Sequence, residues 1–246
     1  MDTPAPHRTT AYGSDPAQVY DVREPTAPST QTSVVVVHGG FWRAKWDRDH
    51  AAPQAQAFAG LGHHVAVVEY RRTGMPGGGW PGTFRDVMVA VAAVRADPSF
   101  PARTVLVGHS AGGHLVALVA AQPEALGLAG VVALAGCTDL ALTRERDLGS
   151  GAALAFMGTQ DSGAWFEADP ARHSPAVPVV LMHGDEDDTV PIEVSESYVA
   201  ATRASAGPHA QVELRRIPGA GHFDVIKPGT PAFAQVVAAI GALSTG

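Results

Sequence analysis

Short apolar runs that alternate with helical patterns constrain the fold of this chain more than any other feature. Six such runs are rich in Val, Leu and Ile and are bounded by turn residues: 33–37, 64–69, 104–107, 131–135, 179–182 and 212–217. Continuous apolar character over so few residues is typical of strands that are buried on both faces of a parallel sheet. We therefore predict an α/β fold with a doubly wound, mostly parallel central sheet flanked by helices.

The segments between the runs predict the rest of this architecture. Apolar residues recur at steps of three and four along 84–94 and 233–243, which indicates amphipathic helices. Residues 8–12 and 18–23 are weaker candidates, which we expect to form antiparallel edge strands. The stretch 138–176 lacks strand character, and we expect a small helical cap there, over the sheet edge where such folds bind ligands. All 246 residues then form a single domain, with residues 1–6 flexible.

Composition and charge exclude several classes of protein. A hydrophobic content of 46% with 17% charged residues describes a folded globular chain. The net charge of −7, without a basic stripe, argues against a nucleic-acid partner. No apolar run approaches the roughly 18 residues of a membrane helix, and the polar N-terminal residues lack a hydrophobic signal core. We therefore expect a cytoplasmic protein with no membrane partner.

The run 108–112 reads Gly-His-Ser-Ala-Gly and carries the strongest chemical signal. In a chain with 27 glycines, this pattern alone is equally typical of a close-packed turn. Its place between a predicted strand and a helix-forming run at 111–121 points instead to a nucleophile elbow. On such a turn Ser110 Oγ stands above the sheet edge, and the N–H of Ala111 at the helix N-terminus can stabilise an oxyanion.

A nucleophilic serine needs a general base, and the base needs an acid that orients it. His222 is our choice of base among 11 histidines, because it follows a Gly-rich loop after the last predicted strand. The acid comes from the loop after the 179–182 run, where Asp185, Asp187 and Asp188 remain alternatives. These acids also suggest a cation site, but the spacing lacks the distal Glu of a Ca²⁺ loop. We expect no metal and no cofactor.

A third element is the His-Gly-Gly-Phe-Trp turn at 38–42, directly after a predicted central strand. Its glycines allow the backbone N–H groups to approach the nucleophile and to form the second half of an oxyanion hole. Trp42 adjoins this turn, so we predict that it contacts the substrate. Cys137 is the only cysteine. It is a possible nucleophile, but a small buried thiol is the interpretation we favour.

With these motifs in this order, the chain resembles the α/β-hydrolase superfamily from about Tyr12 to the last helix. Segments 38–42 and 108–115 resemble small esterases of the arylformamidase (kynurenine formamidase) type and the hormone-sensitive-lipase-like group. The loop at 183–191 is similar to that of prolyl-oligopeptidase-like hydrolases, and this resemblance implies Asp187 as the acid. It also implies Gly40, Phe41 and Ala111 as oxyanion donors, although the lipase-like group usually has a third glycine where Phe41 stands.

Together these inferences predict a serine hydrolase that cleaves small carboxylic esters through an acyl-enzyme, with a Ser110–His222–Asp187 triad. The alternative is an arylformamidase, so the expected partner is a small ester or formamide. A non-catalytic binding protein of the same fold is less favoured, because such proteins have usually lost a triad residue. The short, partly charged cap and the bulky residues 41–42 predict a preference for short acyl groups, from formyl to about butyryl.

Overall fold

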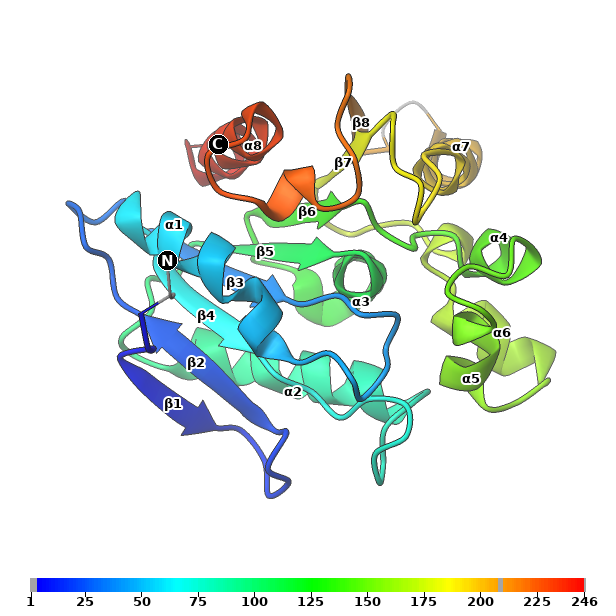
Figure 1. The fold of residues 1–246 in the computed structure, drawn as a ribbon, viewed down its shortest axis with the longest axis horizontal. Coiled ribbons are helices and arrows are strands. Elements are labelled where there is room, and N and C mark those ends of the chain that lie inside the picture. The colour runs from blue at the N-terminus through cyan, green and yellow to red at the C-terminus, as the bar shows by residue number, and fades with distance from the viewer. Residues whose placement is uncertain (1–3, 208–209, 246) are drawn as a thin grey trace.

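The computed structural model describes residues 4–207 and 210–245 and contains one eight-stranded sheet (Figure 1). Its strands are β1 (Arg8–Ala11), β2 (Val19–Arg23), β3 (Ser33–Val37), β4 (His64–Val68), β5 (Thr104–His109), β6 (Gly130–Leu134), β7 (Val179–Gly184) and β8 (Val212–Ile217). The order is β1-β2-β4-β3-β5-β6-β7-β8. The β1–β2 and β2–β4 pairings are antiparallel and the others parallel. This confirms the predicted fold class and its antiparallel edge strands.

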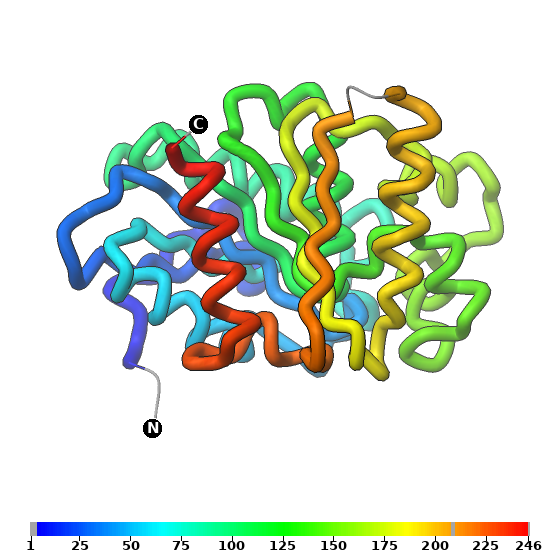
Figure 2. The backbone as a smooth tube through the Cα atoms, turned by 90° about the horizontal axis from the view of Figure 1, so that it is seen from above, coloured from blue at the N-terminus to red at the C-terminus, as the bar shows by residue number. Residues whose placement is uncertain are grey.

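Helices cover both faces of the sheet. They are α1 (Ala52–Gly60), α2 (Gly82–Ala96), α3 (Ala111–Ala120), α4 (Leu140–Glu145), α5 (Ala152–Met157), α6 (Ser162–Ala168), α7 (Glu193–Ala206) and α8 (Pro231–Thr245). Short 3-10 turns lie at Arg48–Ala51 (η1), Pro123–Ala125 (η2), Pro170–Arg172 (η3) and Asp224–Ile226 (η5). Figure 2 shows the C-terminal helix α8 in red, and this helix packs against β5, β6 and β7. None of the helices in the described ranges combines the length and apolarity needed to cross a bilayer.

Two apolar clusters hold these layers together. On one face, Phe58 of α1 stacks on Phe233 of α8 with ring centroids 5.3 Å apart. On the other face, Leu115 of α3 and Tyr198 of α7 belong to a cluster that also includes Leu106 of β5. Fully burying a side chain of this size stabilises the fold by about 1.5–3 kcal/mol. The central strands are therefore fixed firmly enough for their C-terminal ends to position a site.

The segment 138–176 holds the three short helices α4, α5 and α6, which Figure 1 shows grouped beside the ends of the central strands. Aspartate side chains cap two of them: Asp139 accepts from the Leu142 N–H at 2.7 Å, and Asp161 from the Ala164 N–H at 2.7 Å. Such caps satisfy N–H groups that a short helix leaves unpaired. The helices expected in this segment, which we call the cap, are therefore present.

At the N-terminus, residues 1–3 lie outside the described residues, so the expected flexibility there stays a prediction. Arg23 Nη1 donates to the Pro4 carbonyl oxygen at 2.8 Å.

Candidate active site

Ser110 occupies a strained turn between β5 and α3. Its φ of 55° and ψ of −117° lie outside the regions that residues with a side chain ordinarily adopt. The neighbouring glycines make the turn possible, because a Cβ on Gly112 would come within 2.1 Å of the Val37 carbonyl oxygen. The Ser110 N–H donates to the Leu134 carbonyl oxygen at 2.9 Å, which ties the turn to β6. The fold therefore holds Ser110 in the elbow that the sequence predicts.

Asp187 and His222 are hydrogen-bonded to each other beside this elbow. His222 Nδ1 donates to Asp187 Oδ2 at 2.7 Å, and the Asp187 side chain is only 1% exposed. The Val190 and Thr189 N–H groups donate to Asp187 Oδ1 at 2.8 and 2.9 Å. Burial opposes ionisation of this carboxyl, but hydrogen bonds from His183 and His222 outweigh it and hold the pKa of Asp187 well below its ordinary value. Asp187 is therefore an anion that can orient His222.

The other two acids of this loop bind elsewhere. Asp185 Oδ1 accepts from the Gly219 N–H at 2.7 Å, and Asp188 Oδ1 accepts from Thr189 Oγ1 at 3.1 Å. Both residues are exposed. Among residues 4–207 and 210–245, no group of three or more His, Cys, Asp or Glu side chains is arranged to hold a metal ion. Of the three alternatives, the geometry brings only Asp187 to His222.

Ser110 and His222 line the same cavity, although no hydrogen bond joins their side chains within the described part of the chain. Catalytic hydrogen bonds are often loose before substrate binds. His109, the neighbour of Ser110, holds the His222 loop instead: its Nε2 donates to the His222 carbonyl oxygen at 2.9 Å. Burial, reinforced by the nearby His222, lowers the pKa of His109 well below its ordinary value, so this ring is neutral. The sequence motifs do not predict this contact.

The cavity encloses about 170 Å³ and has mostly aromatic walls. Its lining residues are Gly40, Phe41, Trp46, His50, His109, Ser110, Thr189, His222 and Phe223. His50 is half-buried in this wall. Burial lowers the pKa of His50, and the nearby His38 and His222 lower it further. The space beside Ser110 is thus small, apolar and walled by rings.

The structure corrects the prediction that Trp42 contacts the substrate. The Trp42 side chain is fully buried, stacks on Phe156 with ring centroids 4.7 Å apart and meets the His114 ring edge-on at 5.1 Å. Positive φ angles at Phe41 (49°) and Trp42 (56°) turn the chain so that the second ring enters the core. Trp46, 47% exposed, takes the place in the cavity wall that was predicted for Trp42.

The turn after β3 brings its backbone to the nucleophile. A Cβ on Gly39 would lie 3.0 Å from Ser110 Cβ, so only glycine fits at this approach. Gly40 and Phe41 line the cavity. Within the described residues, the N–H groups of Gly40, Phe41 and Ala111 donate to no protein acceptor. They therefore have no protein partner that would compete with an oxyanion, and their role as oxyanion donors stays a prediction.

Cys137 is a buried thiol, and its N–H donates to the Ser110 carbonyl oxygen at 3.2 Å. Burial, together with the nearby Asp187 carboxylate, raises the pKa of the Cys137 thiol to about 12. A thiol in this state is a poor nucleophile at neutral pH, so the favoured interpretation of Cys137 agrees with the structure.

Comparison with known proteins places this geometry in context. The BD-FAE family model matches residues 19–201. The chain is 30% identical to esterase LipC of Mycobacterium tuberculosis, and the match covers 89% of this chain and 60% of LipC. Its matches cover 50–60% of the length of the curated relatives. A truncated carbohydrate esterase from gut microbiota superposes with a TM-score of 0.80 at 20% identity, covering 100% of this chain and 98% of that chain. A Thermogutta terrifontis esterase superposes with a TM-score of 0.73 at 20% identity, covering 96% of this chain and 92% of that chain. These two neighbours share the fold.

Proposed function

The chain belongs to the BD-FAE family, and we propose that it is a serine esterase that cleaves small carboxylic esters through an acyl-enzyme. The observation that carries this proposal is the 2.7 Å hydrogen bond from His222 to a buried Asp187, beside a serine on a strained elbow. The relatives named as esterases support the reaction class. The elbow, the imidazole and the carboxylate are the three parts that nucleophilic acyl transfer requires.

In the first half of the proposed reaction, Ser110 Oγ attacks the ester carbonyl carbon and His222 Nε2 takes the hydroxyl proton. The carbonyl π electrons move to the oxygen, which receives hydrogen bonds from the N–H groups of Gly40, Phe41 and Ala111. When the tetrahedral intermediate collapses, the bond to the alkoxy oxygen breaks and His222 returns the proton to the leaving alcohol. Losing one such oxyanion donor typically costs about 10²–10³ in kcat.

In the second half, water replaces the alcohol. His222 takes one water proton as the oxygen attacks the acyl carbon, and the same oxyanion donors hold the second tetrahedral intermediate. Collapse breaks the bond to Ser110 Oγ, releases the carboxylic acid and restores the serine hydroxyl with the proton from His222. Asp187 stays ionised throughout and stabilises the imidazolium that forms twice in each cycle.

Short acyl groups fit the cavity best. Its volume of about 170 Å³ lies below the roughly 300 Å³ at which pockets for drug-sized ligands begin. The Thermogutta terrifontis esterase has been solved with propionate and with butyrate bound, which supports the same acyl range here. The aromatic walls formed by Phe41, Trp46 and Phe223 also suit an aryl leaving group. That feature favours hydrolysis of aryl formamides as the second candidate function.

A hydrolysis screen tests both candidates. We would measure kcat/KM for p-nitrophenyl esters from acetate to palmitate, and for N-formylkynurenine. We expect a maximum between acetate and butyrate, followed by a fall. A continuous acyl channel would gain about 0.8 kcal/mol per buried methylene, or roughly fourfold in kcat/KM. A steady rise to palmitate would contradict the short-acyl proposal, and a formamide rate above every ester would make the arylformamidase the better assignment.

A further inference from the structure

A second histidine contacts the Asp187 carboxylate. His183, in β7, is fully buried, and its Nε2 lies 3.2 Å from Asp187 Oδ2 and 2.7 Å from the Val190 carbonyl oxygen. Its Nδ1 lies 2.8 Å from Ser195 Oγ, in α7. Asp187 Oδ2 also accepts from His222. Two Ser–His arrangements therefore converge on one carboxylate oxygen: Ser110 and His222 beside the cavity, and Ser195 and His183 inside the core.

The contacts of His183 determine where its proton lies. Both neighbours of Nε2 are oxygen atoms that only accept hydrogen bonds, namely an ionised carboxylate and a backbone carbonyl. Nε2 must therefore carry a hydrogen. Ser195 Oγ can donate to the other ring nitrogen, so neutral His183 is satisfied at both positions. The ring thus donates to the Val190 carbonyl oxygen and places the same N–H edge 3.2 Å, measured from Nε2, from Asp187 Oδ2.

His183 differs from His222 in its access to substrate. His222 lines the cavity, whereas His183 does not, and Ser195 and Val190 beside it are themselves buried. The Asp187 carboxylate accepts three hydrogen bonds, two on Oδ1 and one on Oδ2, and His183 Nε2 adds a 3.2 Å contact to Oδ2. Each donor stabilises the ionised form and makes the carboxylate a weaker base.

We propose that His183 is a positioning residue for Asp187. His183 holds Asp187 Oδ2 toward His222 and limits how strongly the carboxylate stabilises protonated His222. The proposal rests on the proposed Ser110 triad. Asp185, Glu186 and Asp188, in the same loop as Asp187, are exposed. The titratable groups near Asp187 on neighbouring elements of the described chain are His109, from β5, and the Cys137 thiol, from the segment after β6. Burial holds both uncharged at neutral pH. His183 and His222 are therefore the groups that adjust the strength of this acid.

Two substitutions at one position test the proposal. His183→Leu removes the donor and roughly keeps the volume, whereas His183→Gln keeps an amide N–H that can occupy the place of Nε2. For His183→Leu we expect kcat to fall on the order of tenfold with KM unchanged, because His183 does not contact the cavity. The acid limb of the pH profile of kcat/KM should shift to higher pH by roughly half a unit to one unit, because Asp187 becomes a stronger base. His183→Gln should recover most of both quantities.

The outcomes separate a positioning role from simple packing. If both variants lose kcat equally with the acid limb unmoved, or if a folded His183→Leu variant keeps the wild-type kcat and pH profile, the proposal is wrong. Ser110→Ala is assayed in parallel with the same ester. If Ser110→Ala keeps the esterase activity, the proposed function itself is refuted. The His183 variants are therefore compared after the residual rate of Ser110→Ala has been subtracted.

A measurement on the unsubstituted protein covers the case in which His183→Leu does not fold. Two-bond ¹H–¹⁵N spectra of protein labelled with ¹⁵N-histidine report which nitrogen of each ring carries hydrogen. The His183 resonances are assigned as those that move in Ser195→Ala, which changes only the Nδ1 partner. We expect a hydrogen on Nε2 of His183. A ring with hydrogen on Nδ1 and a bare Nε2 would overturn the proposal, since it cannot donate to Asp187.

Discussion

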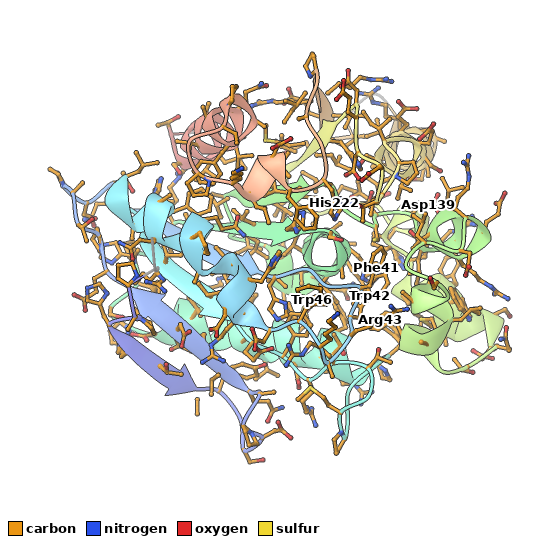
Figure 3. All side chains as sticks on the ribbon, in the orientation of Figure 1. Phe41, Trp42, Arg43, Trp46, Asp139 and His222 are labelled. Carbon is orange, nitrogen blue, oxygen red and sulfur yellow. The ribbon has the colours of Figure 1, made fainter. Side chains whose placement is uncertain are left out.

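The cavity has two sides that are built in different ways. On the triad side, Ser110 directly follows β5, and the loops after β7 and β8 carry Asp187 and His222. On the turn side, the chain leaves β3 with positive φ angles at Gly40, Phe41 and Trp42. Figure 3 labels His222 on the first side and Phe41, Trp42, Arg43 and Trp46 on the second.

The turn side also contacts the cap directly. An added Cβ on Gly149 would lie 2.7 Å from the Phe41 ring, and Arg43 donates to the carbonyl oxygens of Gly149 and Ser150. The triad side is instead held by hydrogen bonds between loops at the sheet edge. We therefore propose that side chains at the sheet edge carry out the proton transfers, whereas the turn supplies backbone N–H groups to the oxyanion and its side chains, with the cap, shape the cavity. Substitutions on the two sides should therefore affect different kinetic constants.

The largest expected effect is on the triad side. Asp187→Asn should lower kcat by about 10⁴, because an amide no longer fixes the productive tautomer of His222. KM should change little. Asp188→Asn is the matched control, since its carboxylate is exposed and accepts only from Thr189 among the described residues. A steady-state comparison in which Asp188→Asn or Asp185→Asn loses more activity than Asp187→Asn would place the acid at a different position.

On the turn side, two tryptophans separate packing from substrate contact. Trp42→Ala should reduce the free energy of unfolding by about 3–5 kcal/mol, because it empties a buried ring site. Trp46→Ala should leave stability nearly unchanged and raise KM on the order of tenfold, because the half-exposed ring lines the cavity. Urea unfolding and initial rates measure both quantities. If Trp46→Ala lowers kcat with KM constant, the proposed division between the two sides fails.

A smaller effect, on the pH dependence of stability, is expected from His114, which connects α3 to the cap. His114 of α3 is fully buried and donates from Nε2 to the Ala168 carbonyl oxygen in the cap at 2.8 Å. Burial lowers the pKa of His114 to about 4, against an ordinary value of about 6.5. Below pH 6.5 the unfolded chain therefore binds a proton that the folded chain does not. This group should cost about 1 kcal/mol of stability between pH 7.0 and 5.5.

His114→Gln is the control variant, because it retains an amide donor for Ala168 and cannot titrate in this range. Its free energy of unfolding should fall less steeply with acid than that of the wild type. It should still fall, because the pKa values of His50, His63 and His109 are also lowered. Equal slopes for the two proteins in urea unfolding at several pH values would exclude His114 as a contributor.

The triad side could be predicted from the sequence because its residues follow the ends of strands. The apolar runs locate the ends of β5 and β7 to within two residues and the end of β8 at the observed residue, and parallel strands bring those ends to one edge. The sequence pattern alone was therefore enough to select Ser110 and His222 as candidates, and to select the loop that carries the acid. Resemblance to known hydrolases then selected Asp187, the acid that the structure places against His222.

The turn side could not be predicted in the same way. Which tryptophan faces the cavity depends on positive φ angles at Phe41 and Trp42, which residue type does not reveal. The contacts of His109 and His183 were also missed, although both residues stand in or beside recognised motifs. The partner of His109 lies 113 residues away, and a sequence pattern gives no sign of such a pairing without the packed loops.

The central claim is that Ser110 is the nucleophile of a serine esterase, and covalent labelling tests it most directly. The protein is treated with a fluorophosphonate, and the adduct is counted and located by intact-mass and peptide mass spectrometry. We predict one adduct per chain, on Ser110, with ester hydrolysis lost in proportion to labelling. In Ser110→Ala we predict no adduct and a fall in kcat on the order of 10⁶. Labelling at another residue, or normal turnover by folded Ser110→Ala, would contradict the assignment.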